Sequence, residues 1–239
     1  NANVKLDTDI EIKGTFLNKG TFTHNNQKVT FTGNASIVTS GDSGQITEFY
    51  DIEIASSASL TLNQDIKIKK DFSNSGGFTV NGKTVSFVKG SAPVSAASTI
   101  SGNAVSFANL SIESGKTLTL NNASLEISGT LTNDGIFDAQ TNSKTVTFTG
   151  TNAEITRTQA APSPMPENKF YDLKIADSAT LKVVLSGINN NEHNKFVKVD
   201  IKNSFINGQN GIFIPHLSNF VFSGTANTNS INHNINFTD

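Results

Sequence analysis

An imperfect internal repeat of about 58 residues runs through this sequence. Leu60-Thr61-Leu62 returns as Leu118-Thr119-Leu120, at an offset of 118 − 60 = 58, and Phe49-Tyr50-Asp51-Ile52 returns as Phe170-Tyr171-Asp172-Leu173. A fixed period of tens of residues is typical of repeat architectures, in which each unit packs against its neighbours. We therefore predict one elongated domain over residues 1–239, a fragment of a longer repeat protein, with copies at approximately 1–48, 49–106, 107–169 and 170–239.

Each copy contains short runs in which apolar and polar side chains alternate, as in Ile66-Lys67-Ile68. This period of two predicts half-buried β-strands. Apolar runs recur after 18 or 19 residues, from Leu60 to Phe78 and from Ile66 to Val85, which suits one coil of a three-sided β-helix. We predict an all-β fold, a right-handed parallel β-helix (β-solenoid) with roughly three coils per repeat and about twelve coils in all. An array of β-sandwiches is the alternative.

Two repeated positions give more specific expectations. An asparagine two residues before a glycine recurs in three copies, at Asn18, Asn74 and Asn133. Each Asn is predicted to bond its own backbone at a corner, where Asn and Gly also tolerate positive φ. A phenylalanine that is predicted to point into the core recurs in all four copies, at Phe31, Phe87, Phe148 and Phe222.

Composition argues against several classes of function. The formal net charge is −2 and Arg157 is the only arginine, so we expect no nucleic-acid partner. The absence of cysteine excludes disulfides and thiolate sites, and mildly favours export. The four histidines lack metal-site spacing, and no apolar run is long enough for a membrane helix. We expect no cofactor, no metal site and no membrane insertion by this segment.

Catalysis and ice binding are the two alternatives to a structural role. A carbohydrate-active lyase or hydrolase on a β-helix needs clustered carboxylates, but here the acids are scattered, and Asp51 and Asp172 occupy equivalent scaffold positions. An ice-binding solenoid needs the same Thr pair on every coil. The Thr-x-Thr pairs, such as Thr117-Leu118-Thr119 and Thr145-Val146-Thr147, fall at different positions in the repeat. We therefore predict that the chain is not an enzyme.

The fourth copy is interrupted by two segments that the other copies lack. The first contains three prolines at alternate positions, which cannot pair as a central strand and predict an exposed loop: Pro162, Pro164 and Pro166. The second is an insertion that contains Asn189, Asn190, Asn191 and His193. Insertions in repeat arrays often form a binding face, so these residues are the candidate ligand-binding residues.

The repeats resemble those of large bacterial cell-surface proteins of the filamentous-haemagglutinin and autotransporter-passenger type. The resemblance covers nearly the whole chain and lies in recurring phrases such as Asn109-Leu110-Ser111-Ile112, Thr117-Leu118-Thr119-Leu120, Gly129-Thr130-Leu131-Thr132-Asn133 and Thr145-Val146-Thr147-Phe148-Thr149-Gly150. It implies a secreted or cell-surface bacterial β-helix that acts as an adhesin or scaffold, and it brings no catalytic residues.

Repeat and resemblance together predict a non-catalytic stalk or adhesin segment of an exported bacterial protein. The non-repeated loops are expected to contact a glycan or protein on a host or neighbouring cell. Uncharged Asn side chains offer donors and acceptors together, which suits carbohydrate hydroxyls. As an isolated fragment the chain is expected to be a monomer.

Overall fold

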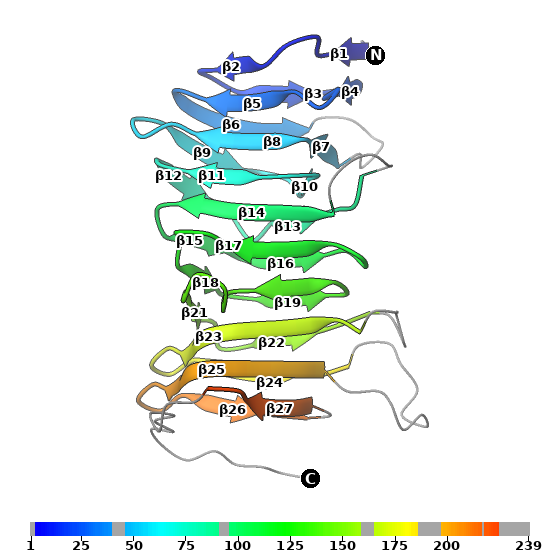
Figure 1. Ribbon diagram of the computed structural model, residues 1–239. Coiled ribbons are helices and arrows are strands. Elements are labelled where there is room, and N and C mark those ends of the chain that lie inside the picture. Colours follow the sequence, from blue (N-terminus) through cyan, green and yellow to red (C-terminus); the bar gives the residue numbers. More distant parts are fainter. Residues whose placement is uncertain are drawn as a thin grey trace.

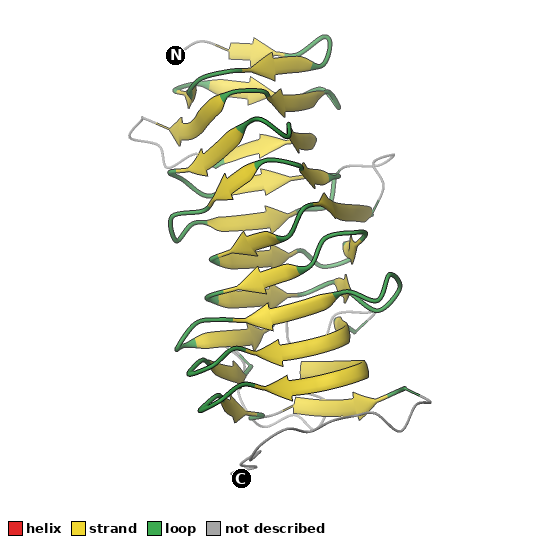
Figure 2. Ribbon diagram, turned by 90° about the vertical axis from the view of Figure 1, so that its left-hand side faces the viewer, coloured by secondary structure: helices red, strands yellow, loops and turns green. Residues whose placement is uncertain are grey.

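The computed structural model describes residues 3–39, 46–90, 96–158, 165–185, 197–216 and 218–224, and these ranges contain strands but no helix. The strands stack in successive coils from one end of the molecule to the other (Figures 1 and 2). Neighbouring coils are joined by parallel ladders throughout, and the solenoid makes about nine turns. The predicted β-solenoid is confirmed, and the alternative of β-sandwiches is wrong. Its right-handed sense stays a prediction.

Strands follow one another in a strict order of three faces, here called A, B and C. Face A consists of β7 (Thr47–Phe49), β10 (Ile66–Ile68), β13 (Thr84–Phe87), β16 (Asn109–Ile112), β19 (Thr130–Asn133), β22 (Ala153–Thr156), β24 (Thr180–Val183) and β26 (Ile212–Ile214). At the N-terminal end this face is continued by the pair β1 (Asn3–Lys5) and β4 (Thr21–Thr23).

Face B consists of β2 (Ile10–Ile12), β5 (Lys28–Phe31), β8 (Asp51–Ile54), β11 (Phe72–Asn74), β14 (Ala97–Gly102), β17 (Thr117–Leu120), β20 (Ile136–Asp138) and β27 (Ser218–Phe222). Face C consists of β3 (Phe16–Asn18), β6 (Asn34–Thr39), β9 (Ser59–Leu62), β12 (Gly77–Thr79), β15 (Val105–Phe107), β18 (Leu125–Ile127) and β21 (Thr145–Phe148). The long strands β23 (Glu167–Ile175) and β25 (Val197–Asn207) cross from B to C, and their register shifts between Phe170 and Asp172.

The predicted coil length holds for the shortest turns only. Leu60 pairs with Phe78 and Ile66 with Val85, as the sequence spacing indicates. Other turns are longer: the offset between paired residues is 28 from Phe72 to Ile100 and reaches 32 from Leu173 to Phe205. The expectation of about twelve coils is therefore wrong, because long connections consume residues without adding a coil.

The sequence repeat and the structural turn are different units. Leu60 lies in β9 and its repeat equivalent Leu118 in β17, which is 17 − 9 = 8 strands later. Because a turn uses three strands, eight strands make 2⅔ turns rather than the three coils per repeat that the sequence predicts. Equivalent residues consequently move to a different face in each copy: Ile10 is on face B, Ile66 on face A and Leu125 on face C.

A continuous apolar core runs along the axis from Leu6 to Phe213. It contains clusters of aromatic rings such as Phe72, Phe78 and Phe107, whose centroids are 4.9 to 5.9 Å apart. Phe31, Phe87 and Phe148 are fully buried, as predicted. Phe222 is 41% exposed, so the prediction is wrong for this residue. It lies on β27, which among the described residues is paired with β25 alone.

The corner asparagines behave as predicted. The side-chain oxygens of Asn18, Asn74 and Asn133 each accept the N–H of the glycine two residues later, at 3.0 to 3.2 Å. The reason for the glycine is different from the one predicted. Positive φ occurs elsewhere, for example at Asn81. At Gly135 a Cβ atom would overlap the carbonyl oxygen of Lys116 and lie 2.7 Å from that of Glu113, so glycine lets successive coils approach.

Candidate functional site

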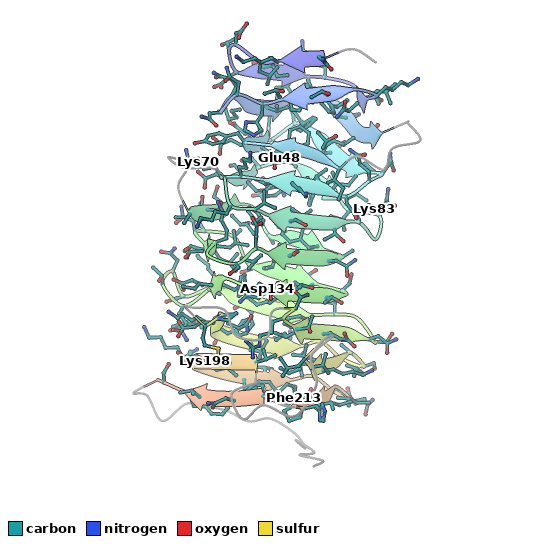
Figure 3. The ribbon with its side chains drawn as sticks, turned by 90° about the vertical axis from the view of Figure 1, so that its right-hand side faces the viewer. Glu48, Lys70, Lys83, Asp134, Lys198 and Phe213 are labelled. Atoms are coloured by element: carbon teal, nitrogen blue, oxygen red, sulfur yellow. The ribbon has the colours of Figure 1, made fainter. Side chains whose placement is uncertain are left out.

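One edge of the solenoid, where the chain passes from face A to face B, combines the longest connections with the buried charges. We call it the insertion edge, and Figure 3 shows the molecule with this edge toward the viewer. In most turns the connection is short, such as Tyr50 alone or residues 69–71. Three turns carry longer connections on this same edge, over residues 88–96, 157–166 and 184–196.

The sequence-predicted ligand residues belong to the last two of these connections. Six of them lie outside the described residues: Pro162, Pro164, Asn189, Asn190, Asn191 and His193. Pro166 is described and is buried rather than exposed, because the chain has already rejoined the sheet at Glu167, whose N–H donates to the carbonyl of Gly135 at 3.0 Å.

The strands that flank the two insertions are direct neighbours. Before the insertions, Ile155 of β22 is paired with Val183 of β24; after them, Asn168 of β23 is paired with Val199 of β25. Both connections therefore leave and re-enter the solenoid side by side in consecutive turns. Sequence reasoning could identify the two insertions but could not place their ends together.

Near the N-terminal end, Glu48 is the centre of a charged cluster on the insertion edge. Its Oε1 lies 2.7 Å from Nζ of Lys69 and 3.5 Å from Nε2 of His24. The Nδ1 of His24 accepts the N–H of Asn26 at 3.0 Å, so Nε2 is the nitrogen that carries a proton toward Glu48. The hydrogen bond from His24, together with Lys69, lowers the pKa of Glu48 to about 2.

This cluster predicts a pH-dependent contribution to stability. A carboxyl whose pKa is lower in the folded state stabilises the fold above its ordinary pKa of 4.5, and loses that effect as pH falls toward about 2. Because the Glu48 side chain is 35% exposed, solvent screening reduces the effect. We expect Glu48→Gln to lower the free energy of unfolding by about 1–2 kcal/mol at pH 7.

Urea unfolding at pH 7 and at a pH close to 2 tests this prediction. The difference between the wild type and Glu48→Gln should shrink at the lower pH, where Glu48 is protonated in the unfolded state and about half protonated in the folded state. A difference that stays constant between the two pH values would contradict the assignment.

The charged cluster around Glu48 continues onto face B. Nζ of Lys70 lies 5.6 Å from the ring centroid of Tyr50, and 3.8 Å from a carboxylate oxygen of both Asp51 and Asp71. Asp51 accepts the N–H of Asp71 at 2.8 Å, and Asp71 accepts the N–H of Thr99 at 2.7 Å. Burial raises the pKa of Asp51. These two carboxylates connect one coil to the next.

Lys116 is a fully buried cation further along the insertion edge. Its Nζ donates to the carbonyl oxygen of Lys69, and burial lowers its pKa although Asp71 and Glu113 oppose the shift. Sequence reasoning missed this residue, yet a signal exists. At the equivalent repeat positions the chain has Ala58 and Ala179, both buried, so Lys116 is a departure from the repeat.

Arg157 and Asp134 form the third charged region of the insertion edge. Arg157 is 1% exposed, and the attraction of Asp134 opposes the lowering of its pKa by burial. Its Nη1 donates to the sulfur of Met165 at 3.7 Å, whereas Nε and Nη2 have no partner among the described residues. Asp134 accepts both the N–H and the hydroxyl of Thr158. The only arginine of the chain is thus buried at the base of the first insertion.

Acidic and amide side chains elsewhere repeat one structural role. An Asp or Asn oxygen accepts a backbone N–H of an adjacent coil in several turns, as Asp9 does from Lys28, Asp65 from Thr84 and Asn109 from Thr130. These groups hold coils in register. Among the described residues, no group of three or more His, Asp or Glu side chains is placed to hold a metal ion.

The Thr-x-Thr pairs do not combine into one array. Thr117 and Thr119 are on face B, whereas Thr145 and Thr147 are on face C. The pair Thr21 and Thr23 belongs to the N-terminal continuation of face A. Successive coils of one face therefore do not present the same Thr pair, because the eight-strand repeat moves each equivalent strand to another face.

None of the described segments is a helix of the length and apolarity that crossing a membrane requires. Comparison of the chain with protein-family models, with curated proteins and with solved structures gave no match.

Proposed function

We propose that this chain is a rigid, non-catalytic spacer of an exported bacterial surface protein, and that it recognises a glycan or protein on another surface through the insertion edge. The observation that carries the proposal is the concentration of long connections on one edge. Three turns lengthen at the A–B edge while the ladders of all three faces continue past them.

The chemistry of the described part of the edge supports an uncharged ligand. Glu48 is paired with Lys69, and the Asp134 carboxylate accepts two hydrogen bonds from Thr158, so both carboxylates already have partners within the chain. A cationic ligand would have to compete with these internal contacts. The Asn-rich insertion supplies amide donors and acceptors, which match the hydroxyl groups of a carbohydrate.

The decisive experiment shortens the two adjacent insertions to the length of the connection at residues 69–71. Binding to a glycan panel and to host or neighbouring bacterial cells is then compared with the unaltered chain. We expect binding to fall at least about tenfold, with the circular dichroism spectrum and melting temperature retained.

A matched control shortens the connection at residues 88–96 in the same way. This connection lies on the same edge but several turns away. The control should leave binding unchanged. Full binding by the chain with both insertions shortened and an intact fold would overturn the adhesive part of the proposal and leave a plain spacer.

A further inference from the structure

Two faces of the solenoid contain an interruption between neighbouring coils. Among the described residues, no ladder joins β4 to β7 on face A, or β12 to β15 on face C. The other two faces of the same coils are paired, β5 with β8 and β6 with β9 in the first case, and β10 with β13 and β11 with β14 in the second. Strands β12 and β15 come eight strands after β4 and β7, which is the step of the sequence repeat. The interruption therefore recurs at equivalent places.

The interruption on face A lies inside the stack and encloses a cavity. Paired strands flank it on both sides, β1 beyond β4 and β10 beyond β7. The cavity has a volume of about 300 Å³, at the lower end of the range for small-ligand sites. Its lining residues, which define what we call the face-A gap, are Asn18, Thr21, Phe22, Ile46, Thr47, Glu48 and Lys67.

One part of the lining is apolar. The ring of Phe22 is half-buried and packs on Phe16 and Phe49, at 5.1 and 5.6 Å between ring centroids. Ile46 is 44% exposed beside it. A fixed aromatic ring next to an aliphatic side chain suits the C–H groups on one face of a sugar ring, because this contact removes apolar area from water.

The opposite part of the lining offers a hydrogen-bond donor. Thr47 is 2% exposed, and its Oγ1 accepts Nδ2 of Asn18 at 3.2 Å and Nε2 of Gln64 at 3.1 Å. The oxygen of Thr47 is the acceptor in both bonds, so its own proton is left over, and no described residue accepts it. A hydroxyl group of a ligand in the cavity can accept this proton.

The cavity also carries an excess positive charge. Lys67 and Glu48 are direct neighbours across the ladder between β10 and β7. Glu48 is already engaged by Lys69, at 2.7 Å, whereas Lys67 forms no ion pair with any described residue. Two ammonium groups therefore share one carboxylate, and a second carboxylate supplied by a ligand would form a charge-assisted hydrogen bond with Lys67.

The polar lining is a departure from the repeat. At the second interruption, Phe78 keeps the aromatic position, but Val105 stands at the place of Thr47, at an offset of 105 − 47 = 58. Glu126 of β18 stands at the place of Lys67 of β10. The open ladder alone therefore requires neither the hydroxyl donor nor the ammonium group that the face-A gap contains.

We infer that the face-A gap binds one sugar unit that carries a carboxylate. Lys67 pairs with the carboxylate, Thr47 donates to a ring hydroxyl, and Phe22 contacts the apolar face of the ring. This site goes beyond the function proposed above. It uses no residue of the two insertions at 157–166 and 184–196, so either site can fail without the other.

Titration of the isotope-labelled chain with three small probes, followed by NMR, tests the inference. Methyl glucuronide has both the sugar ring and the carboxylate, methyl glucoside has the ring alone, and acetate has the carboxylate alone. We expect methyl glucuronide to shift the amide signals of Thr47 and Lys67 saturably, at a concentration at least about tenfold lower than either of the other two probes needs.

Each other outcome of the titration overturns the inference. Equal binding of methyl glucoside would remove the role of the carboxylate, and equal binding of acetate would remove the role of the sugar ring. Saturable shifts confined to other parts of the chain, or no saturable shift at all, would show that the face-A gap does not bind this class of ligand.

Two substitutions place in the face-A gap the residues of the second interruption: Thr47→Val and Lys67→Glu. Because β15 and β18 contain these residues, the fold should be retained, which the melting temperature checks. Thr47→Val removes the hydroxyl donor and Lys67→Glu removes the ammonium partner. Each should weaken the binding of methyl glucuronide by about tenfold or more. If Thr47→Val lowers the melting temperature, Lys67→Glu alone decides.

Lys182→Glu is the matched control for charge. Lys182 lies on β24, on the same face but several turns away from the gap. Its replacement makes the same change of charge and should leave the binding of methyl glucuronide unchanged. Unaltered binding in Lys67→Glu, or an equal loss in Lys182→Glu, would overturn the assignment of Lys67 to the site.

Discussion

Replacing Phe87 with alanine should lower the free energy of unfolding by about 3–5 kcal/mol. Phe87 is fully buried on face A, where its strand β13 is paired with β10 and β16. Removing the ring eliminates its apolar burial and leaves a cavity that rigid ladders on both sides prevent from collapsing. Chemical denaturation monitored by circular dichroism measures the loss.

Phe222→Ala is the matched control, because Phe222 occupies the same repeat position but is exposed in the last described coil. Its replacement should cost less than about 1 kcal/mol in dilute protein, as for other exposed positions. Equal losses of unfolding free energy for Phe87→Ala and Phe222→Ala would contradict the difference in burial between the two phenylalanines.

The second large effect is expected for Gly102→Ala, at about 2–4 kcal/mol. Gly102 has φ of +97°, which an L residue adopts only with strain. A Cβ there would also overlap the Asn74 carbonyl oxygen and lie 2.7 Å from its carbon. Backbone strain and the forced separation of two coils act together, and crowding of this kind alone typically costs about 1–3 kcal/mol.

Gly14→Ala provides the comparison at an open position. No atom lies within 4 Å of a Cβ placed there, so the substitution should be neutral or slightly stabilising through the unfolded state. Melting curves and urea denaturation of both variants measure the difference. Similar stabilities for Gly102→Ala and Gly14→Ala would mean that the coils can separate at Gly102 without cost.

The local alternation of apolar and polar residues was enough to predict much of this fold. Side chains one residue apart in a strand point to opposite faces, so runs such as Ile66-Lys67-Ile68 specify an inward and an outward side without tertiary information. The shortest coils also followed from spacing, and Leu60 pairs with Phe78 as predicted. The corner hydrogen bonds of Asn74 and Asn133 followed from local turn chemistry.

The number of turns depended on the lengths of the connections, and the face of each strand depended on how many strands precede it. Neither quantity is visible in the local sequence of a strand. Residues at equivalent positions of the sequence repeat therefore lie on different faces, as Ile10, Ile66 and Leu125 do.

The insertion edge was recognisable in part. Prolines and an Asn-rich run marked two insertions, but the pairing of Ile155 with Val183, which brings their ends together, joins residues of different turns. Lys116 and Arg157 gave no sign of burial as residue types, because both are usually exposed. Sequence determined that this chain forms short alternating strands in stacked coils. Only the tertiary structure decided which charges those coils bury, because that depends on contacts between turns that no local pattern encodes.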